Sequence, residues 1–152
     1  MEETIFGINT VLETIKSHPE RVHQIFLPIE NLKGKKSEIY ALARQHNIKI
    51  QRIPRNRFDT LVGKEAHQGV VGIVSPYSYQ RFESLLEHWR TSQEKALFLI
   101  LDGIEDPRNF GAIVRTANTV GVHGIIVPKH RSAPANQLVA KAAAGALAYT
   151  SV

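Results

Sequence analysis

Apolar and polar positions along the first seventy-five residues follow two periods, one typical of helices and one typical of strands. Apolar side chains at Val11, Leu12 and Ile15 recur at helical spacing, whereas residues 48–53 alternate one by one as in a half-buried strand. In chain order, the pattern predicts a strand that passes into a helix at 5–18, a strand at 22–28, a helix at 37–47, and strands at 48–53 and 69–74. These elements together predict a small α/β unit.

The second half of the chain has a different pattern. After a proline turn, Phe82, Leu85, Leu86 and Trp89 predict an amphipathic helix within residues 76–95. Residues 96–102 are almost continuously apolar, which is typical of a parallel strand covered on both faces. A helix at 110–120, a strand at 124–128, a helix at about 134–148 and a short strand at 150–152 follow. The order predicts the start of a βαβαβ unit with a parallel sheet.

We therefore expect an α/β protein with a first domain at 1–75, a linker helix at 76–95 and a second domain at 96–152. An apolar fraction of 43% in 152 residues is enough to build real cores. No apolar run is long enough to span a bilayer, and the acidic N-terminus is unlike a signal peptide. We expect a cytoplasmic protein that does not bind membranes.

The amino-acid composition excludes several kinds of functional site. The chain contains no cysteine, which excludes disulfides, thiolate nucleophiles and cysteine-based zinc sites. Its seven histidines form no metal-spaced pair, so we expect no metal. A formal net charge of +5 favours a polyanionic partner, nucleic acid first. Many basic residues fall between Lys33 and Lys64, although mild basicity without any functional meaning stays open.

Residues 101–128 carry the most informative pattern. Asn109 is predicted to cap a helix on which Phe110, Ile113, Val114, Ala117 and Val120 face the core. Arg115 lies on the opposite side, with Gly111 and Asn118, where it is free to meet a ligand. Gly111 would allow close approach of a backbone or a phosphate, and the helix N-terminus would favour an anion. The alternative is a solvated arginine on a helix with an ordinary cap. A dinucleotide or triphosphate glycine pattern is not present here.

The run DPRNFGAIVRTANTVGVHGIIVP, residues 106–128, resembles the first signature motif of the SpoU, or TrmH-like, branch of the SPOUT RNA 2′-O-methyltransferases. Asn109, Gly111 and Arg115 occupy the key positions of that motif. FGINTVLETI at 6–15 and HQGVVGIV at 67–74 are similar to the opening and closing segments of the family's substrate-binding domain. The combination resembles most the enzymes that methylate a guanosine ribose in 23S ribosomal RNA. The resemblance implies a ribosomal-protein-like RNA-binding domain followed by a SPOUT domain.

The resemblance also implies roles for particular residues. Arg115 and Asn109 are the expected catalytic residues, and the expected RNA-binding residues are Arg108, Gly111, Asn118, His67, Gln68 and Asn9. Relatives are described as using the matching arginine as a base, but arginine side chains keep their proton at neutral pH, which favours an electrostatic stabiliser or a phosphate clamp. Asn109 would orient that arginine or the ribose.

Histidine is the usual general base at neutral pH, so His67 offers a competing hypothesis. Its place in an HQG turn before a strand favours turn structure or RNA contact instead. His123 and His130 have no partner pattern and are expected at the surface.

The family continues for roughly another hundred residues, as the small size of the second domain also indicates. We therefore expect an incomplete SPOUT domain, with S-adenosylmethionine bound by residues beyond Val152, no activity from this chain alone, and a homodimer in the complete protein. Three alternatives stay open: a non-catalytic RNA-binding protein, a transfer RNA 2′-O-methyltransferase relative, and a generic ligand-binding α/β domain.

Overall fold

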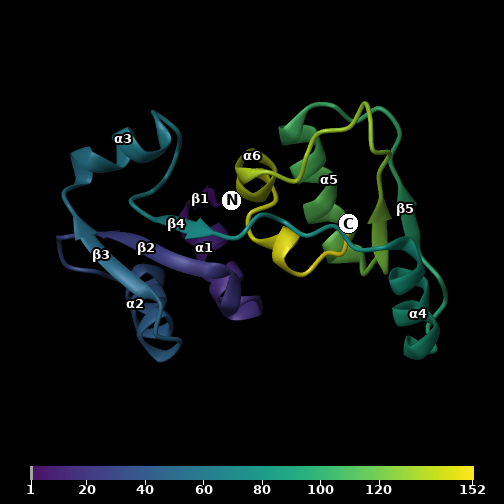
Figure 1. Ribbon diagram of the computed structural model, residues 1–152, viewed down its shortest axis with the longest axis horizontal. Helices are drawn as coiled ribbons and strands as arrows, with labels where there is room; N and C mark the ends of the chain where they lie inside the picture. The colour runs from purple at the N-terminus through teal and green to yellow at the C-terminus, as the bar shows by residue number, and fades with distance from the viewer. Residues whose placement is uncertain (1) are drawn as a thin grey trace. The chain divides into compact units, whose positions relative to one another are not determined.

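A computed structural model describes residues 2–152. The chain divides into two compact units at the junction between Pro76 and Tyr77. Figure 1 shows the first unit in purple to teal and the second in teal to yellow. Each unit contains its own sheet and its own helices, so the expected α/β class is confirmed for both halves.

The first unit is built on a four-stranded mixed sheet. Its strands are β1 (Glu3–Phe6), β2 (Val22–Pro28), β3 (Lys49–Ile53) and β4 (Val71–Val74), in the spatial order β1-β4-β2-β3. β2 and β3 run parallel, whereas β4 pairs antiparallel with both β1 and β2. The four predicted strands are confirmed, and β3 lies at the edge of the sheet.

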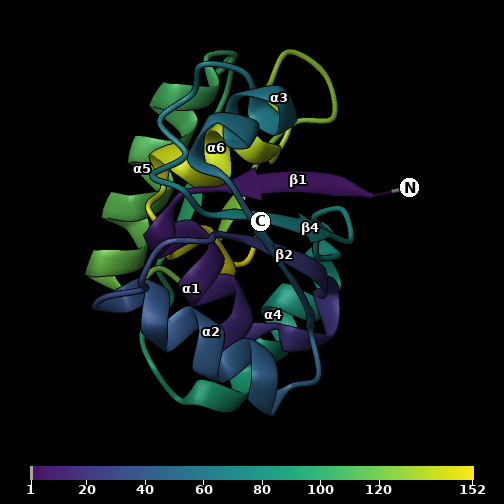
Figure 2. The same cartoon turned by 90° about the vertical axis from the view of Figure 1, so that its left-hand side faces the viewer.

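Helices cover the two faces of this sheet unequally. They are α1 (Ile8–Ser17), α2 (Lys35–Gln45) and the short α3 (Phe58–Val62), with 3₁₀ turns at Pro19–Arg21 and Arg55–Arg57. Figure 2 shows α1 and α2 on one side of the sheet and α3 on the other. Val11, Leu12 and Ile15 of α1 are almost fully buried, as their spacing predicts. Each contributes about 1.5–3 kcal/mol through burial.

Side chains fix the ends of these helices. The backbone N–H of Ile8, in the first turn of α1, donates to Gln68 Oε1 at 3.1 Å, which satisfies one of the orphan donors of the helix start. Asn47 follows α2 with a φ of 57°, the left-handed conformation that asparagine tolerates well. The predicted helix stop at Asn47 is confirmed.

The second unit contains a two-stranded parallel sheet. Its strands are β5 (Phe98–Ile100) and β6 (Gly124–Ile126), and its helices are α4 (Phe82–Ser92), α5 (Pro107–Val120) and α6 (Gln137–Ala142), with a 3₁₀ turn at Ala146–Ala148. The predicted parallel pairing is confirmed. The helix within 76–95 is α4, and Leu85 on it lies directly against the backbone of Gly124 on β6.

Three expectations for this unit are wrong. β5 is not covered on both faces, because Ile100 is 72% exposed. The helix expected at 134–148 is interrupted after α6, where Ala144 and Gly145 have φ angles of 52° and 100°. The last residues form no assigned strand in the part of the chain described, and Ser151 accepts one bond to the sheet, from the N–H of Ile125 at 2.9 Å.

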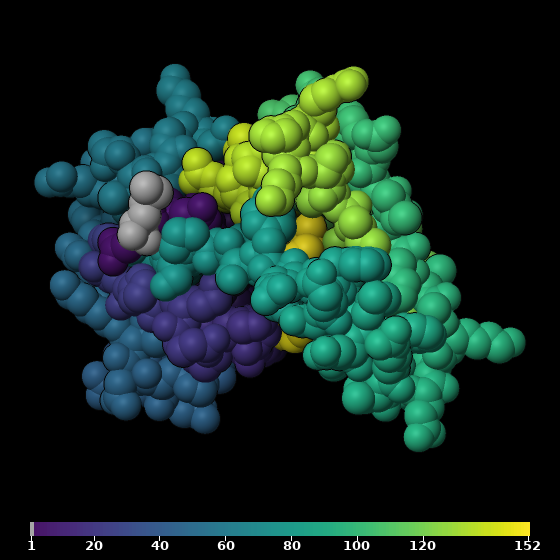
Figure 3. Space-filling view, turned by 45° about the vertical axis from the view of Figure 1, so that its right-hand side comes forward, coloured from purple at the N-terminus to yellow at the C-terminus, as the bar shows by residue number. Residues whose placement is uncertain are grey.

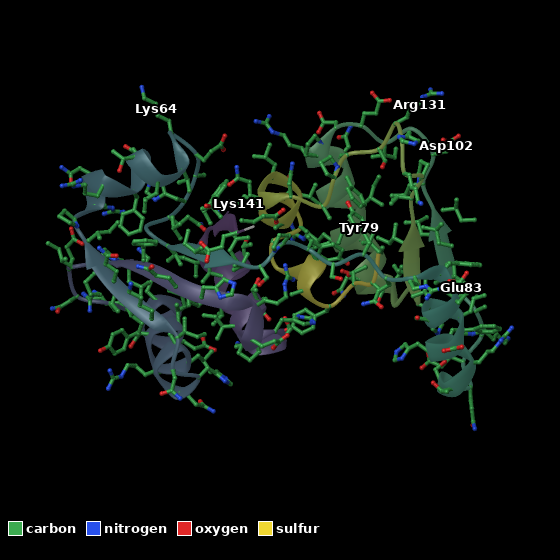
Figure 4. The ribbon with its side chains drawn as sticks, viewed as in Figure 1. Lys64, Tyr79, Glu83, Asp102, Arg131 and Lys141 are labelled. Atoms are coloured by element: carbon green, nitrogen blue, oxygen red, sulfur yellow. The ribbon has the colours of Figure 1, made fainter. Side chains whose placement is uncertain are left out.

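Loops of the second unit are tied to its elements by hydrogen bonds. The hydroxyl of Tyr79, labelled in Figure 4, accepts from the N–H of Ala135 at 2.8 Å. The N–H of Ala133 donates to Ile104 O at 2.8 Å. The segment between β6 and α6, yellow-green in the space-filling view of Figure 3, therefore keeps a defined path across the surface of this unit.

Within residues 2–152, we find no helix with the length and apolarity needed to cross a membrane.

Candidate active site

The candidate catalytic residues lie on α5, whose start is set by Asp106. The Asp106 carboxylate accepts from the backbone N–H groups of Arg108 at 2.7 Å and Asn109 at 3.1 Å. Pro107 occupies the first helical position, where its fixed φ favours the helix and its missing N–H costs nothing. The prediction that Asn109 caps the helix is therefore wrong, because the Asp-Pro pair starts α5 three residues earlier.

This cap also changes the expected anion site. A helix N-terminus attracts anions through N–H groups that lack intrahelical partners. Here two of those groups already bind the carboxylate of Asp106. The negative group at the start of α5 belongs to the chain itself, so this helix start gives no support to a bound phosphate.

Gly111 is buried at a close contact between α5 and α6, rather than exposed beside Arg115. A Cβ atom on Gly111 would lie 2.4 Å from Ala142 Cβ and 2.7 Å from Val139 O. Glycine is required because any side chain would overlap with the neighbouring helix. Gly111 therefore allows α6 to pack closely against α5. The expectation that Gly111 faces a phosphate is wrong.

Arg115 is exposed on α5, as predicted. It lies beside an open groove of about 370 Å³, whose other lining residues are Ala112, Thr116, Thr119, Val120 and Ala142. No carboxylate oxygen of the described residues lies within 4.0 Å of its guanidinium. The side chain of Arg115 therefore keeps its donors available for a ligand.

The buried stripe of α5 is narrower than predicted. Phe110, Val114 and Ala117 are at most 3% exposed, whereas Val120 is 60% exposed and Ile113 is half-buried. Val120 is the last residue of α5. Together with Leu97, Ile113 and Val122 it lines an apolar groove of about 440 Å³ between β5 and α5.

Asn109, Arg108 and Asn118 are all exposed on α5. Asn109 and Arg115 are six positions apart, which separates them by about 9 Å along the axis and by about a third of a turn around it. No hydrogen bond joins their side chains among the described residues. Arg108, seven positions before Arg115, lies on nearly the same side of the helix. The structure thus groups Arg108 with Arg115 and leaves Asn109 apart.

The candidate RNA-binding residues of the first unit form local contacts. His67 stacks on Phe58 with ring centroids 5.3 Å apart, its Nδ1 accepts from the N–H of Gly69 at 2.9 Å, and its Nε2 lies 3.1 Å from Asp59 Oδ1. Gly69 has a φ of 71°, so this segment is the predicted turn. The ring nitrogens of His67 are already engaged, which argues against its use as a general base.

Gln68 and Asn9 come together at the start of α1. Gln68 accepts from the N–H of Ile8, and Asn9 Oδ1 accepts from Lys35 Nζ at 2.8 Å. Both side chains are exposed, with a lysine beside them. Their placement is compatible with RNA contact but also fully explained by capping and by a surface hydrogen bond.

His123 is not a surface residue, which corrects its prediction. Its side chain is 9% exposed, its Nδ1 accepts from the N–H of Leu97 at 3.2 Å, and its Nε2 lies 3.2 Å from Glu94 Oε2. These contacts anchor the segment before β5. His130 is exposed, as expected.

Lys141 and Asp106 are not among the predicted site residues. Burial lowers the pKa of Lys141 on α6 below its usual 10.5. Asp106 was missed as a cap, although the Asp-Pro pair at a helix start is a readable signal. No cluster of carboxylates or histidines that could hold a metal ion occurs among residues 2–152.

Taken together, these observations define an α/β protein with a mixed-sheet unit followed by a parallel-sheet unit, and α5 of the second unit carries an exposed arginine without an ion-pair partner among the described residues. Residues 4–80 match the family described as RNA 2′-O ribose methyltransferase substrate binding. Residues 96–152 match the SpoU rRNA methylase family. The chain belongs to the SpoU/TrmH family of RNA methyltransferases.

Similar proteins support this membership. The chain is 38% identical over 148 residues to YacO of Bacillus subtilis (strain 168), which carries the name of a TrmH family tRNA/rRNA methyltransferase, covering 97% of this chain and 59% of that protein. It is 39% identical to a protein of the same family name from Staphylococcus saprophyticus, covering all of this chain and 61% of the relative. The chain thus spans about three fifths of the length of these curated relatives.

Solved structures share the fold. An AdoMet-bound rRNA methyltransferase from Sinorhizobium meliloti superposes with a TM-score of 0.73 at 20% identity, covering 99% of this chain and 52% of the other. The SpoU methyltransferase AviRb from Streptomyces viridochromogenes, in complex with AdoMet, gives 0.75 at 20% identity, covering 99% and 54%. At this identity the likeness establishes the fold.

Proposed function

We propose that this chain belongs to an enzyme that transfers a methyl group from S-adenosylmethionine to the 2′-hydroxyl of a guanosine in 23S ribosomal RNA. The observation that carries the proposal is Arg115, exposed and without an ion-pair partner on α5, within the segment that matches the SpoU rRNA methylase family. A free guanidinium at this position suits an RNA substrate, whose phosphates and reacting oxygen are negative or become so.

In this proposal Arg115 stabilises the negative charge that develops on the ribose oxygen, or holds the neighbouring phosphate. It does not act as a base, because a guanidinium keeps its proton at neutral pH. Arg108 lies on the same side of α5 and would bind a second phosphate. Asn109 and Asn118 would contact the ribose or the RNA backbone from the flanks of the helix. The first domain, proposed at 1–75, would bind the RNA, with the helix within 76–95 leading to the second.

We propose that residues 2–152 do not by themselves form the pocket for S-adenosylmethionine. The groove beside Arg115 is lined by side chains of two helices, whose backbone groups are largely engaged, and it offers no polar loop to hold an adenosine and an amino acid. We assign the pocket of the methyl donor to the additional length of the full enzyme, together with a homodimeric assembly. We expect no S-adenosylmethionine binding by this chain in calorimetric titration.

The experiment is methyl transfer to ribosomal RNA by the full enzyme, with the methylated position mapped. Arg115→Lys keeps the charge but loses the planar fork, and we expect kcat to fall about 10²- to 10³-fold. Arg90→Lys, an exposed arginine on α4, is the matched control and should leave kcat unchanged. Near-normal turnover of Arg115→Lys would contradict the role of Arg115.

The same assay distinguishes the substrate. Relatives carry the name of tRNA/rRNA methyltransferases, so transfer RNA is the second candidate. Methylation of ribosomal RNA alone supports the proposal. Methylation of transfer RNA alone would overturn the assignment of ribosomal RNA as the substrate.

A further inference from the structure

The positive charge of this protein is concentrated in one short stretch. Residues 44–64 contain six lysines and arginines against a single acidic residue, which gives a net charge of +5, while the rest of the chain carries thirteen of each sign. The formal charge of the whole protein therefore resides in these twenty-one residues, all within the first unit.

The fold places these cations on β3 and on the segments directly before and after it in the chain. Arg44 lies in the last turn of α2, Lys49 and Arg52 on β3, Arg55 and Arg57 in the turn that follows, and Lys64 just after α3. β3 is the outermost strand of its sheet, and all six side chains are exposed. Figure 4 shows Lys64 extending away from the ribbon. We call this set of six residues the β3 cationic edge.

None of the six cations has a carboxylate partner within 4.0 Å in the described part of the chain. Arg52 is instead held by backbone oxygens, since its Nε donates to Pro28 O at 2.7 Å and its NH2 group to Glu30 O at 2.8 Å. Like charges kept together without neutralisation are unfavourable unless an anion binds between them. Charges on an edge strand also hinder unwanted strand pairing. That role would not account for the pocket that lies beside these residues.

A pocket of about 330 Å³ lies beside this edge, between α3 and the face of the sheet that α1 and α2 do not cover. Its lining residues are Phe26, Gln51, Ile53, Pro54, Arg57, Thr60 and Leu61. The walls are mostly apolar and include the aromatic ring of Phe26, together with the guanidinium of Arg57 and the amide of Gln51. The Oε1 atom of Gln51 accepts from Gln24 Nε2 at 2.8 Å, which fixes the amide and leaves its own NH2 group without a bond among the described residues.

We propose that the β3 cationic edge binds an RNA backbone and that the adjacent pocket receives one unpaired base. Resting on the proposed function, this inference names the part of the RNA that the first unit recognises. The apolar walls would cover the faces of the base, Gln51 would donate to its edge, and the surrounding cations would hold the flanking phosphates. A fully paired helix keeps its bases stacked and would use only the cations.

The test uses two fluorescent RNA duplexes, one fully paired and one that differs by a single unpaired adenosine, across a salt series. The chain should bind the bulged duplex about tenfold more tightly, as expected for one stacked base. Gln51→Ala and Thr60→Phe, which fills the pocket, should remove this preference. Thr91→Phe is the matched control, because Thr60 and Thr91 are exposed helical threonines that both donate to the carbonyl three residues earlier.

Removing charge should have a different effect. Arg55→Gln and Lys64→Gln should weaken both duplexes equally and reduce the slope of log affinity against log salt by about one each. Arg90→Gln should change neither. Circular dichroism verifies that each variant is folded.

The outcomes separate this inference from the proposed function. Binding of neither duplex would overturn this inference, whereas the proposed function is tested separately by methyl transfer to ribosomal RNA. Binding of the two with equal affinity, or full preference retained by Gln51→Ala and Thr60→Phe, would overturn the pocket and leave RNA methylation standing. Identical losses for Arg55→Gln and Arg90→Gln would overturn the assignment of the edge.

Discussion

Gly111 shows how strongly one residue can depend on a neighbour far along the chain. In an exposed helix, alanine is more favourable than glycine by about 1 kcal/mol. At position 111 the added methyl group would lie 2.4 Å from Ala142 Cβ. We expect Gly111→Ala to lower the free energy of unfolding by about 1–3 kcal/mol, as overpacking does. Urea denaturation followed by circular dichroism measures it.

The double variant Gly111→Ala with Ala142→Gly is the control for this contact. It removes the overlap between the two methyl groups, while Val139 O still lies 2.7 Å from the new atom. Stability should therefore return in part. A single Gly111→Ala variant more stable than the native chain would show that α5 and α6 do not pack this closely.

Lys16 and Glu38 form an ion pair between α1 and α2, with Nζ and Oε1 2.8 Å apart. The hydrogen bond with Glu38 raises the pKa of Lys16 above 10.5. Because the folded pKa is the higher one, the stabilisation is present below pH 10.5 and is lost as pH rises through the folded pKa. Glu38→Gln should lower the melting temperature slightly at pH 7, and the difference should shrink above pH 10.5 and at high salt.

The matched control is Glu20→Gln, which removes an exposed carboxylate without an ion-pair partner among the described residues. Its effect on the melting temperature should not follow the titration of Lys16. An equal loss for Glu38→Gln at pH 7 and at pH 12 would be incompatible with the ion pair.

At the scale of the elements, the start of α5 depends on its cap. Asp106→Ala removes the acceptor for two backbone N–H groups, and we expect a loss of about 1 kcal/mol in the free energy of unfolding. Asp106→Asn keeps an acceptor oxygen and should lose much less. Asp102→Ala, an exposed aspartate four residues earlier, is the control in the same thermal and urea measurements. Equal losses for Asp106→Ala and Asp102→Ala would contradict the cap.

The spacing of apolar residues predicts where helices and strands form better than it predicts which other elements cover them. The strands of the first unit and the helices α1, α2 and α5 follow from the spacing of apolar residues, because that spacing reflects which side is buried. The run at 96–102 is apolar throughout, yet Ile100 is 72% exposed, since an apolar run indicates a strand without fixing its neighbours. The break after α6 requires left-handed angles at Ala144 and Gly145, and an alanine-rich sequence favours helix there.

Contacts between distant residues account for most of what the sequence could not predict about the candidate site. The exposure of Arg115 follows from helical spacing alone. The burial of Gly111 depends on α6, and that of His123 depends on Glu94 and Phe98. The left-handed turn at Gly69 could be predicted, because glycine supplies such angles, whereas the stacking of His67 on Phe58 could not.

For the whole molecule, two separate cores imply two separate stabilities. The first unit has its own four-stranded sheet, and its Phe6, Leu12, Ile25 and Phe58 are at most 1% exposed. We expect a peptide of residues 1–76 to unfold cooperatively in urea and to give dispersed amide resonances, although a domain of this size is only marginally stable. It should also retain salt-dependent RNA binding.

A peptide of residues 77–152 can be compared with the peptide of residues 1–76. The second unit exposes Leu97 and Val120 at the groove between β5 and α5, and Ile100 elsewhere on β5. This peptide should therefore bind a hydrophobic dye more strongly than residues 1–76 do. A disordered 1–76 peptide would show that the first unit needs the second in order to fold.

The contact at Gly111 has a consequence for how such sequences diverge. Gly111 serves the packing of α5 on α6, whereas Arg115, one turn further along, contacts the substrate in the proposed function. A related protein that has lost the reaction but kept the fold no longer needs arginine at position 115. It still needs glycine at position 111, because α6 packs against that position. If Arg115 has the proposed role, loss of this arginine beside an intact glycine would mark a gene whose product still folds and no longer methylates RNA.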